Sequence, residues 1–110
     1  MDLINKRCKH DVLPLRLEEI TNLIEQTPDW NLNTDRIEKD FKFWDFKLAI
    51  EFINKVAELA ENENHHPDIN LYNYKNVKII LSTHAVKGLS ENDFILAAKI
   101  DQIFGGSYEN

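Results

Sequence analysis

The sequence of 110 residues is poor in cysteine, proline and glycine, with one, three and three copies. Because the single cysteine, Cys8, cannot form an intramolecular disulfide, we expect a reducing compartment and a cytoplasmic location. The scarcity of glycine and proline, together with a hydrophobic content of 43%, argues against a disordered chain. The composition therefore predicts a folded globular protein.

Positive charge and long hydrophobic runs are also missing. The formal net charge is −6 and the lysines are scattered, whereas nucleic-acid-binding proteins usually carry a basic patch. No hydrophobic run approaches the length of a membrane-spanning helix, and the opening segment MDLINKRCKHDV lacks the apolar core of a signal peptide. We therefore expect no nucleic-acid partner, no membrane and one domain over residues 1–110, with residues 1–12 as a loose lead-in.

The spacing of hydrophobic residues predicts three helices and two β-hairpins. Helices are expected over residues 13–26, 45–64 and 90–104, and hairpins over 30–43 and 69–83. Asp45 and Ser90 are the expected N-caps, and Gly105 and Gly106 are expected to end the last helix. The order αββαββα is typical of an α+β fold, a four-stranded antiparallel sheet with the helices packed on one face.

The same spacing predicts which side chains face the core. In the first helix the expected stripe is Leu13, Leu17, Ile20, Leu23 and Ile24. In the second helix the expected face is Phe46, Ala49, Ile50, Ile53, Val56, Ala57 and Ala60. Along the last strand, alternate residues are expected to point one way: Val77, Ile79, Leu81 and Thr83.

Three histidines could carry chemistry. His65 and His66 lie at the exit of the second helix, directly before Pro67, and the following hairpin returns the chain so that His84 comes near them. Asp93, one short loop after His84, could orient an imidazole. Because imidazoles titrate near neutral pH, one could donate a proton while another accepts one. Such a cleft would serve an elimination or a tautomerisation.

Other interpretations of the same residues remain open. Three histidines can hold zinc, but adjacent histidines point in different directions and no pair has the i, i+4 spacing of a helical metal site. Histidines at a helix end often only bind free carbonyls, and Asp93 suits the first turn of a helix. Glu61 and Glu63 are most simply solvated charges, and His10 has nothing near it in sequence. The residues alone therefore indicate an α+β domain with a candidate histidine cleft.

Longer stretches resemble a known family. HHPDI (65–69), YNYKNVKIILSTHAVKGLSENDFILAAKID (72–101) and FKFWDFKLAIEFINKVAELAE (41–61) are similar to the pterin-4a-carbinolamine dehydratases, and the likeness runs from about Leu13 to Ile103. The resemblance implies a metal-free hydro-lyase without a cofactor. An enzyme of this family removes water from 4a-hydroxytetrahydropterin, the product of aromatic amino acid hydroxylases, and yields quinonoid dihydropterin.

The resemblance also implies roles for individual residues. His65, His66 and His84 would be the catalytic and pterin-binding imidazoles, with His65 and His84 as the acid/base pair and His66 holding the ring. Asp93 would orient or charge the site, and Glu61 matches a family carboxylate near the pocket. His66, Asp93 and Glu61 are thus the expected substrate-binding residues.

The partners implied by the resemblance are a pterin, a second copy of the chain and a metabolic enzyme. A homodimer or homotetramer is expected, assembled partly through the open edges of the sheet. The metabolic partner would be an aromatic amino acid hydroxylase such as phenylalanine hydroxylase. Two alternatives stay open: a protein-binding module that acts as a dimerisation cofactor or assembly factor, and a dehydratase for another pterin.

Overall fold

A computed structural model describes residues 2–107 of the chain. Its helices and strands are α1 (Leu17–Glu25), β1 (Asn31–Asn33), β2 (Arg36–Lys42), α2 (Phe46–Glu63), β3 (Asp68–Tyr72), β4 (Asn76–Leu81) and α3 (Glu91–Ser107). Two short 3-10 helices, η1 (Leu3–Asn5) and η2 (His84–Val86), lie before α1 and after β4. The predicted αββαββα order is confirmed. Among the described helices, none is long and apolar enough to cross a membrane.

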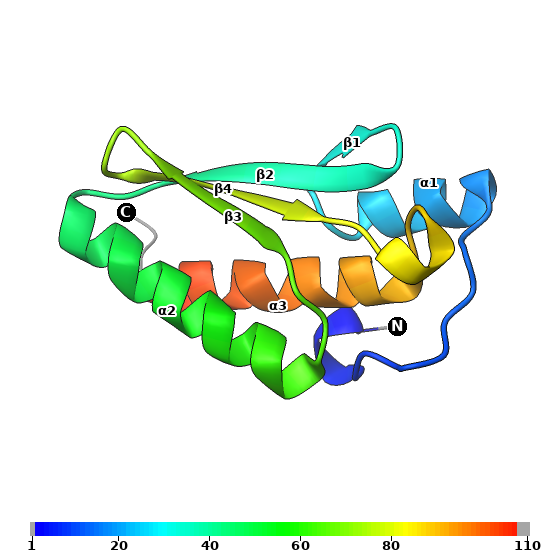
Figure 1. Ribbon diagram of the computed structural model, residues 1–110. Helices are drawn as coiled ribbons and strands as arrows, with labels where there is room; N and C mark the ends of the chain where they lie inside the picture. Colours follow the sequence, from blue (N-terminus) through cyan, green and yellow to red (C-terminus); the bar gives the residue numbers. More distant parts are fainter. Residues whose placement is uncertain (1, 108–110) are drawn as a thin grey trace.

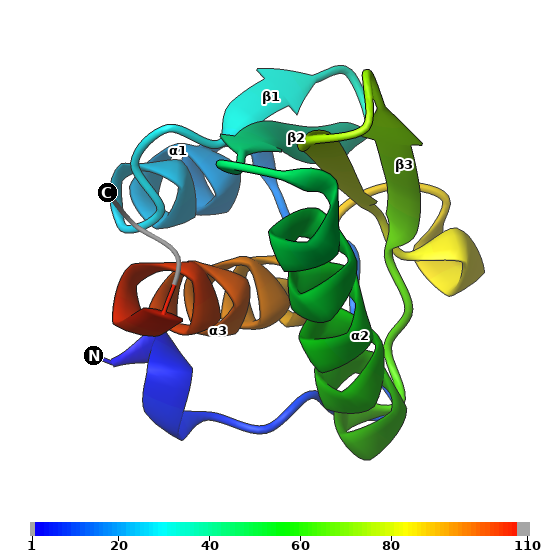
Figure 2. The same ribbon diagram turned by 90° about the vertical axis from the view of Figure 1, so that its left-hand side faces the viewer.

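The four strands form one antiparallel sheet in the order β1-β2-β4-β3. Two hairpins are joined through the central pair, in which β2 and β4 are aligned from Ile37 opposite Leu81 to Lys42 opposite Asn76. Figures 1 and 2 show α1, α2 and α3 on one face of this sheet. The predicted α+β architecture, with its helices on one face, is confirmed.

Alternation along the central strands builds the core beneath the sheet. The inward residues Val77, Ile79 and Leu81 of β4 are fully buried, as predicted. They pack with Ile37 and Phe41 of β2, which are also buried. Because successive side chains of a strand point to opposite faces, each two-residue step adds one more buried group to the same layer.

One inward position of β2 carries a charge. Lys39 lies between Ile37 and Phe41, and its Nζ is 2.8 Å from Asp101 Oδ1 on α3. The indole Nε1 of Trp30 donates to the other oxygen of Asp101 at 3.0 Å. Burial raises the pKa of the Asp101 carboxyl, while the bond from Lys39 opposes that rise. The lysine is tolerated inside because its charge is paired there.

The first helix begins later than the spacing predicts. Leu13 precedes Pro14, which disfavours a helical backbone, and the Leu15 N–H donates instead to the Leu89 carbonyl at 2.9 Å. Leu13 and Leu17 were expected on the buried stripe, but they are 83% and 74% exposed. The rest of the stripe packs against the core as predicted, through Ile20, Leu23 and Ile24.

The second helix has the predicted N-cap, but the face that it buries differs from the predicted face. Asp45 accepts a hydrogen bond from the Leu48 N–H at 2.8 Å. Phe52, which the predicted face omits, is fully buried, with its ring centroid 5.0 Å from that of Phe41. Phe46 and Ala57 were expected inside and are exposed. Apolar residues on α2 fit two neighbouring stripes, and the aromatic side chains beneath β2 select the stripe that holds Phe52.

The last helix continues past its predicted end. Gly105 and Gly106 were expected to terminate it, but α3 runs through both to Ser107. A glycine inside a helix costs about 1 kcal/mol, which disfavours the helix without stopping it. Glycine ends a helix by adopting a positive φ, and no glycine in the described part of the chain does so.

The opening segment, expected to be a loose lead-in, packs on the domain. Leu3 is 6% exposed and belongs to the core. The Cys8 N–H donates to Glu63 Oε1 at 2.8 Å, and the Lys9 N–H donates to Asn92 Oδ1 at 2.9 Å. We call residues 6–12 the strap. It crosses from the end of α2 to the start of α3, at the lower right of Figure 1.

The buried carboxylate of Glu63 predicts how stability depends on pH. Burial works to raise its pKa, but bonds from Lys99 Nζ at 2.8 Å and from the Cys8 N–H outweigh burial and hold the pKa below its ordinary value of 4.5. Because the pKa is lowered on folding, Glu63 stabilises the fold above about pH 4.5, and this contribution is lost as pH falls through the folded pKa.

We therefore expect the free energy of unfolding, measured by urea titration between pH 7 and pH 3, to fall less steeply with pH in Glu63→Gln than in the unaltered protein. Glutamine keeps an acceptor for the Cys8 N–H but does not titrate. Glu58→Gln, at an exposed position on the same helix, is the control and should follow the unaltered curve. A Glu63→Gln curve parallel to that of the unaltered protein would contradict the assignment.

Candidate active site

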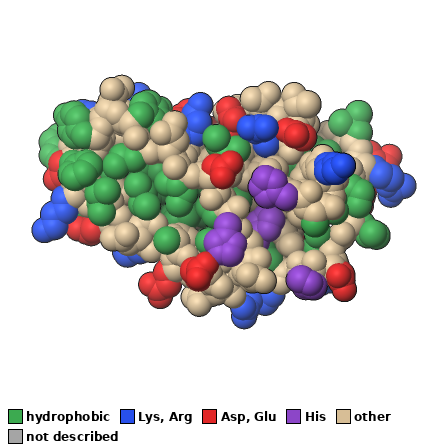
Figure 3. Space-filling model, viewed as in Figure 1, with side chains coloured by type: hydrophobic (Ala, Val, Ile, Leu, Met, Phe, Trp, Pro, Cys, Tyr) green, Lys and Arg blue, Asp and Glu red, His purple; other side chains and the backbone are tan. Residues whose placement is uncertain are grey.

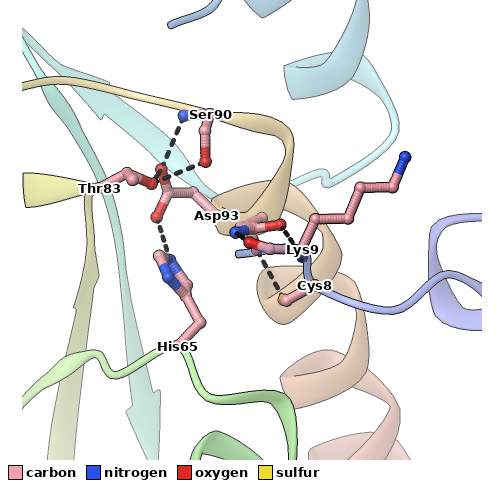
Figure 4. Close-up of polar contacts among 7 residues, drawn as sticks. Cys8, Lys9, His65, Thr83, Ser90 and Asp93 are labelled. Carbon is pink, nitrogen blue, oxygen red and sulfur yellow. Dashed lines mark hydrogen bonds and ion pairs between the residues drawn. The ribbon is translucent and has the colours of Figure 1, made fainter. Parts of the chain in front are cut away.

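A fully buried carboxylate lies under the end of the sheet. Asp93, on the first turn of α3, is 0% exposed. Its Oδ1 is 2.7 Å from His65 Nε2, and its Oδ2 accepts from Thr83 Oγ1 at 2.8 Å and from the Ser90 N–H at 3.0 Å. Figure 4 shows the three partners converging on this carboxylate from three different segments. Both oxygens are occupied, so the orientation of the carboxylate is fixed.

The hydroxyls behind Asp93 have a defined direction of donation. Thr83 Oγ1 lies 2.7 Å from Ser90 Oγ, and both side chains are buried. A hydroxyl carries one proton, and the proton of Thr83 goes to Asp93. Ser90 must therefore donate to Thr83. The Ser90 N–H to Asp93 bond is also half of a capping box, which agrees with the predicted cap at the start of α3.

The end of α2 sends the two adjacent histidines in different directions. Asn64 adopts a left-handed conformation with φ of 54°, and the His65 N–H then donates to the Ala60 carbonyl at 3.2 Å. His65 turns inward to Asp93, with its side chain 11% exposed. His66 turns outward and pairs with Glu61, and these two side chains are 57% and 76% exposed.

The hairpin of β3 and β4 brings His84 to the same end of the sheet. Asp68 at the start of β3 pairs with Ile80 near the end of β4, so the residues before β3 and after β4 are neighbours. His84 opens η2, and its exposed side chain forms no hydrogen bond or ion pair with any residue in 2–107. The predicted approach of His84 to the two adjacent histidines is thus found in the structure.

One pocket of about 330 Å³ joins these side chains. It is lined by all the histidines of the chain, His10, His65, His66 and His84, and also by Lys9, with no Asp or Glu on its described wall. Figure 3 shows histidine side chains gathered on this face. A larger hollow of about 470 Å³ between the strap and α1 contains no histidine.

The two predicted carboxylates lie outside the wall of the pocket. Asp93 is buried behind His65, which favours a role through that imidazole over contact with a ligand. Glu61 pairs with His66 on the solvent side. His10 was set aside from sequence and yet lines the pocket. No periodic pattern could reveal it, because its place depends on distant bonds from the strap to Glu63 and Asn92.

The arrangement suits proton transfer. His65 and His66 each donate a hydrogen bond from Nε2–H to a carboxylate, so Nδ1 of each ring can accept a proton.

Burial raises the pKa of the Cys8 thiol to about 12, and the nearby Glu63 charge adds to the rise, so this thiol is not a nucleophile at neutral pH. In the described part of the chain, no three His, Cys, Asp or Glu side chains are grouped so that they could hold a metal ion.

Comparison with known proteins identifies the family of the chain. The family model described as pterin 4 alpha carbinolamine dehydratase matches residues 13–103. A protein from Halorhodospira halophila, provisionally named pterin-4-alpha-carbinolamine dehydratase, is 46% identical over 99 residues, which are 87% of this chain and 89% of the relative. The mitochondrial pterin-4-alpha-carbinolamine dehydratase 2 of Arabidopsis thaliana is 36% identical, over 93% of this chain and 59% of its own length.

Two solved structures share the fold. The transcriptional coactivator/pterin dehydratase of Brucella melitensis has a TM-score of 0.77 at 30% identity, over 82% of this chain and 97% of that chain. A pterin dehydratase-like protein, described as a RuBisCO assembly factor in the alpha-carboxysome, has a TM-score of 0.57 at 25% identity, over 69% of this chain and 87% of that chain.

The buried hydroxyl of Thr83 gives a test of the Asp93 cluster. Thr83→Val keeps the shape of the side chain but removes a donor to Asp93 and the acceptor for Ser90, so we expect a loss of about 1–3 kcal/mol in the free energy of unfolding. Thr83→Ser keeps the hydroxyl and should lose only about 0.8 kcal/mol for the missing methyl group. Urea denaturation measures both, and a valine variant as stable as the serine variant would contradict the bonding described.

Proposed function

The chain belongs to the pterin 4 alpha carbinolamine dehydratase family, and from this premise we propose that it is a hydro-lyase acting on a 4a-hydroxytetrahydropterin. The observation that carries the proposal is the buried Asp93–His65 pair at a pocket shared with His66 and His84. The product is the quinonoid dihydropterin. In this role the protein recycles the pterin cofactor of aromatic amino acid hydroxylases, with phenylalanine hydroxylase as the proposed metabolic partner.

The reaction needs one base and one acid. A base takes the proton from N5, the N5–H electron pair forms the N5=C4a double bond, and the C4a–O bond breaks. The departing hydroxyl takes a proton from the acid and leaves as water. The balance closes without an oxidant, a reductant or an added cofactor. The catalysis is proposed to be metal-free because histidines of the pocket can make both proton transfers.

We assign the two proton transfers to His65 and His84. His65 is supported as the base because the buried Asp93 carboxylate stabilises the imidazolium that forms when Nδ1 takes the N5 proton. His84 is exposed and unpaired among the described residues, so it can donate to the leaving hydroxyl and recover a proton from water. His66, whose Nε2 forms a hydrogen bond with Glu61 on the solvent side, is assigned to binding the pterin ring.

The central prediction concerns the rate of dehydration. Purified protein added to freshly generated 4a-hydroxytetrahydropterin should speed the appearance of quinonoid dihydropterin, followed by absorbance. His84→Ala should lower kcat by about 10²–10⁴-fold, the usual contribution of positioned proton transfer, with the circular dichroism spectrum unchanged. Lys42→Ala, exposed at the far end of β2, is the control and should keep full activity.

Three outcomes would overturn parts of this proposal. A rate no faster than buffer would remove the dehydratase function, and an unchanged rate in His84→Ala would remove that histidine from the chemistry. Activity lost on treatment with a chelator, and restored by a metal ion, would overturn metal-free catalysis.

We also propose that the protein is a homodimer or homotetramer joined through the edge of its sheet. β1, with three residues, and β3, with five, are the two edge strands of the sheet, and among the described strands β3 pairs with β4 alone. An unpaired strand edge of this kind is ready to pair with a second copy.

A protein-binding function is the second candidate. It is supported by the solved relatives described as a coactivator and an assembly factor, and by the Trp44 side chain, which is 78% exposed.

Assembly through β3 predicts the effect of a single edge charge. Light scattering should give a mass of two or four times 12.9 kDa for the unaltered protein. Asn70→Lys, at the exposed middle of β3, places like charges near each other in a two-fold strand pair and should lower that mass. Asn31→Lys on β1 is the control. A monomeric unaltered protein, or dissociation by Asn31→Lys alone, would contradict this interface.

The proposed location is the cytoplasm, supported by the single cysteine, which is not disulfide-bonded within the chain. The name of the Arabidopsis thaliana relative includes the mitochondrion.

A further inference from the structure

The strap contributes to the pocket although it lies before the part of the chain that the family model matches, residues 13–103. Lys9, His10 and Val12 line the same pocket as the catalytic histidines. The proposed reaction uses His65, His66 and His84 and assigns nothing to these three residues. The strap is therefore a part of the pocket wall whose role the proposed function leaves open.

The strap is bound at two points beside the Asp93–His65 pair. The Lys9 N–H donates to Asn92 Oδ1 at 2.9 Å, and Asn92 Nδ2 donates back to the Lys9 carbonyl at 2.8 Å. Asn92 is 4% exposed and directly precedes Asp93. Figure 4 shows Cys8 and Lys9 beside the first turn of α3, next to Asp93.

The second point lies at the end of α2. The Cys8 N–H donates to Glu63, which is 8% exposed and stands two residues before His65. The two attachments therefore hold the strap against the two segments that carry the pair. The position of His10, one residue beyond Lys9, is set by the same bonds that border the catalytic pair.

The imidazole of His10 is free to bind a ligand. It is exposed, and it forms no hydrogen bond or ion pair with any other described residue. No carboxylate supports it, whereas Asp93 supports His65 and Glu61 supports His66. The proposed reaction already assigns its two proton transfers to His65 and His84, so binding is the role left for His10.

We propose that His10 is a substrate-binding residue that forms a hydrogen bond with the polar side chain of the pterin, and that the strap is fixed so as to hold it there. This proposal rests on the proposed function. The proposed function places the reacting ring at His65, which contacts Asp93 on the buried side of the pocket. In that position the ring substituent would extend toward the exposed wall that the strap forms. An imidazole can donate to or accept from a hydroxyl group on that substituent.

The test separates binding from chemistry. His10→Ala should raise KM about 2- to 12-fold, the factor for one hydrogen bond between neutral groups, and leave kcat within two-fold. His10→Gln, which keeps a donor and an acceptor, should recover part of the loss. Asp11→Asn, on the same strap but outside this pocket, is the matched control and should leave KM unchanged.

Two further arms identify the group that His10 contacts and the purpose of the strap. With a substrate that carries a methyl group in place of the polar side chain, His10→Ala should have no effect on KM. Asn92→Ala releases the strap and should raise KM, and its effect should not add to that of His10→Ala in the double variant. Additive effects would show that the strap does not position His10.

The outcomes for His10 and for the reaction are distinguishable. An unchanged KM in His10→Ala, or a fall in kcat instead, overturns the role of His10 while the dehydratase function stands. If the unaltered protein does not speed dehydration, the dissociation constant of a stable 7,8-dihydropterin that carries the hydroxylated side chain, measured by fluorescence, tests His10 directly. Equal dissociation constants for the unaltered protein and His10→Ala, or no binding by either, overturn the proposal.

Discussion

The burial of the Asp93 carboxylate is the constraint on which the rest of the site depends. A carboxylate removed from water is tolerated only when hydrogen bonds replace the lost hydration. Asp93 meets this need with three donors: Thr83 at the end of β4, Ser90 before α3 and His65 beyond α2. Ser90 and Thr83 are 3 and 10 residues from Asp93 in sequence, whereas His65 is 28 residues away. Satisfying one buried group therefore brings the imidazole at the end of α2 to the strand end and the helix start.

The same principle operates twice more, and each time it involves α3. Glu63 at the end of α2 is 8% exposed and receives Lys99 of α3, while Asp101 of α3 receives Lys39 of β2. Two buried acids, Asp93 and Glu63, and the partly buried Asp101 thus connect α3 to the sheet, to α2 and, through Glu63, to the strap. Because hydrogen-bonded charge pairs are directional where apolar packing is not, they restrict the orientation of α3, which carries Asp93.

The sequence predicts those features that local patterns encode. The order of elements, the Asp45 cap and the inward residues of β4 follow from periodicity and capping, and the structure shows all of them. The failures occur where a distant partner decides. Phe52 is buried because the aromatic side chains beneath β2 select one of two apolar stripes on α2. The strap packs on the domain through hydrogen bonds to Glu63 and Asn92, and a hydrophobic pattern cannot predict such bonds.

The placement of carboxylates relative to imidazoles explains how an acidic protein can present a pocket wall without acids. The chain has a net charge of −6, yet Asp93 lies behind His65 and Glu61 lies on the solvent side of His66. A carboxylate on the wall itself would repel electron-rich groups of a bound heterocycle and compete for their hydrogen bonds. Set behind the rings, these two carboxylates accept from Nε2 of His65 and of His66, which fixes the tautomer of both imidazoles. The two acids of the site therefore orient His65 and His66 and leave the described wall of the pocket to neutral and basic side chains.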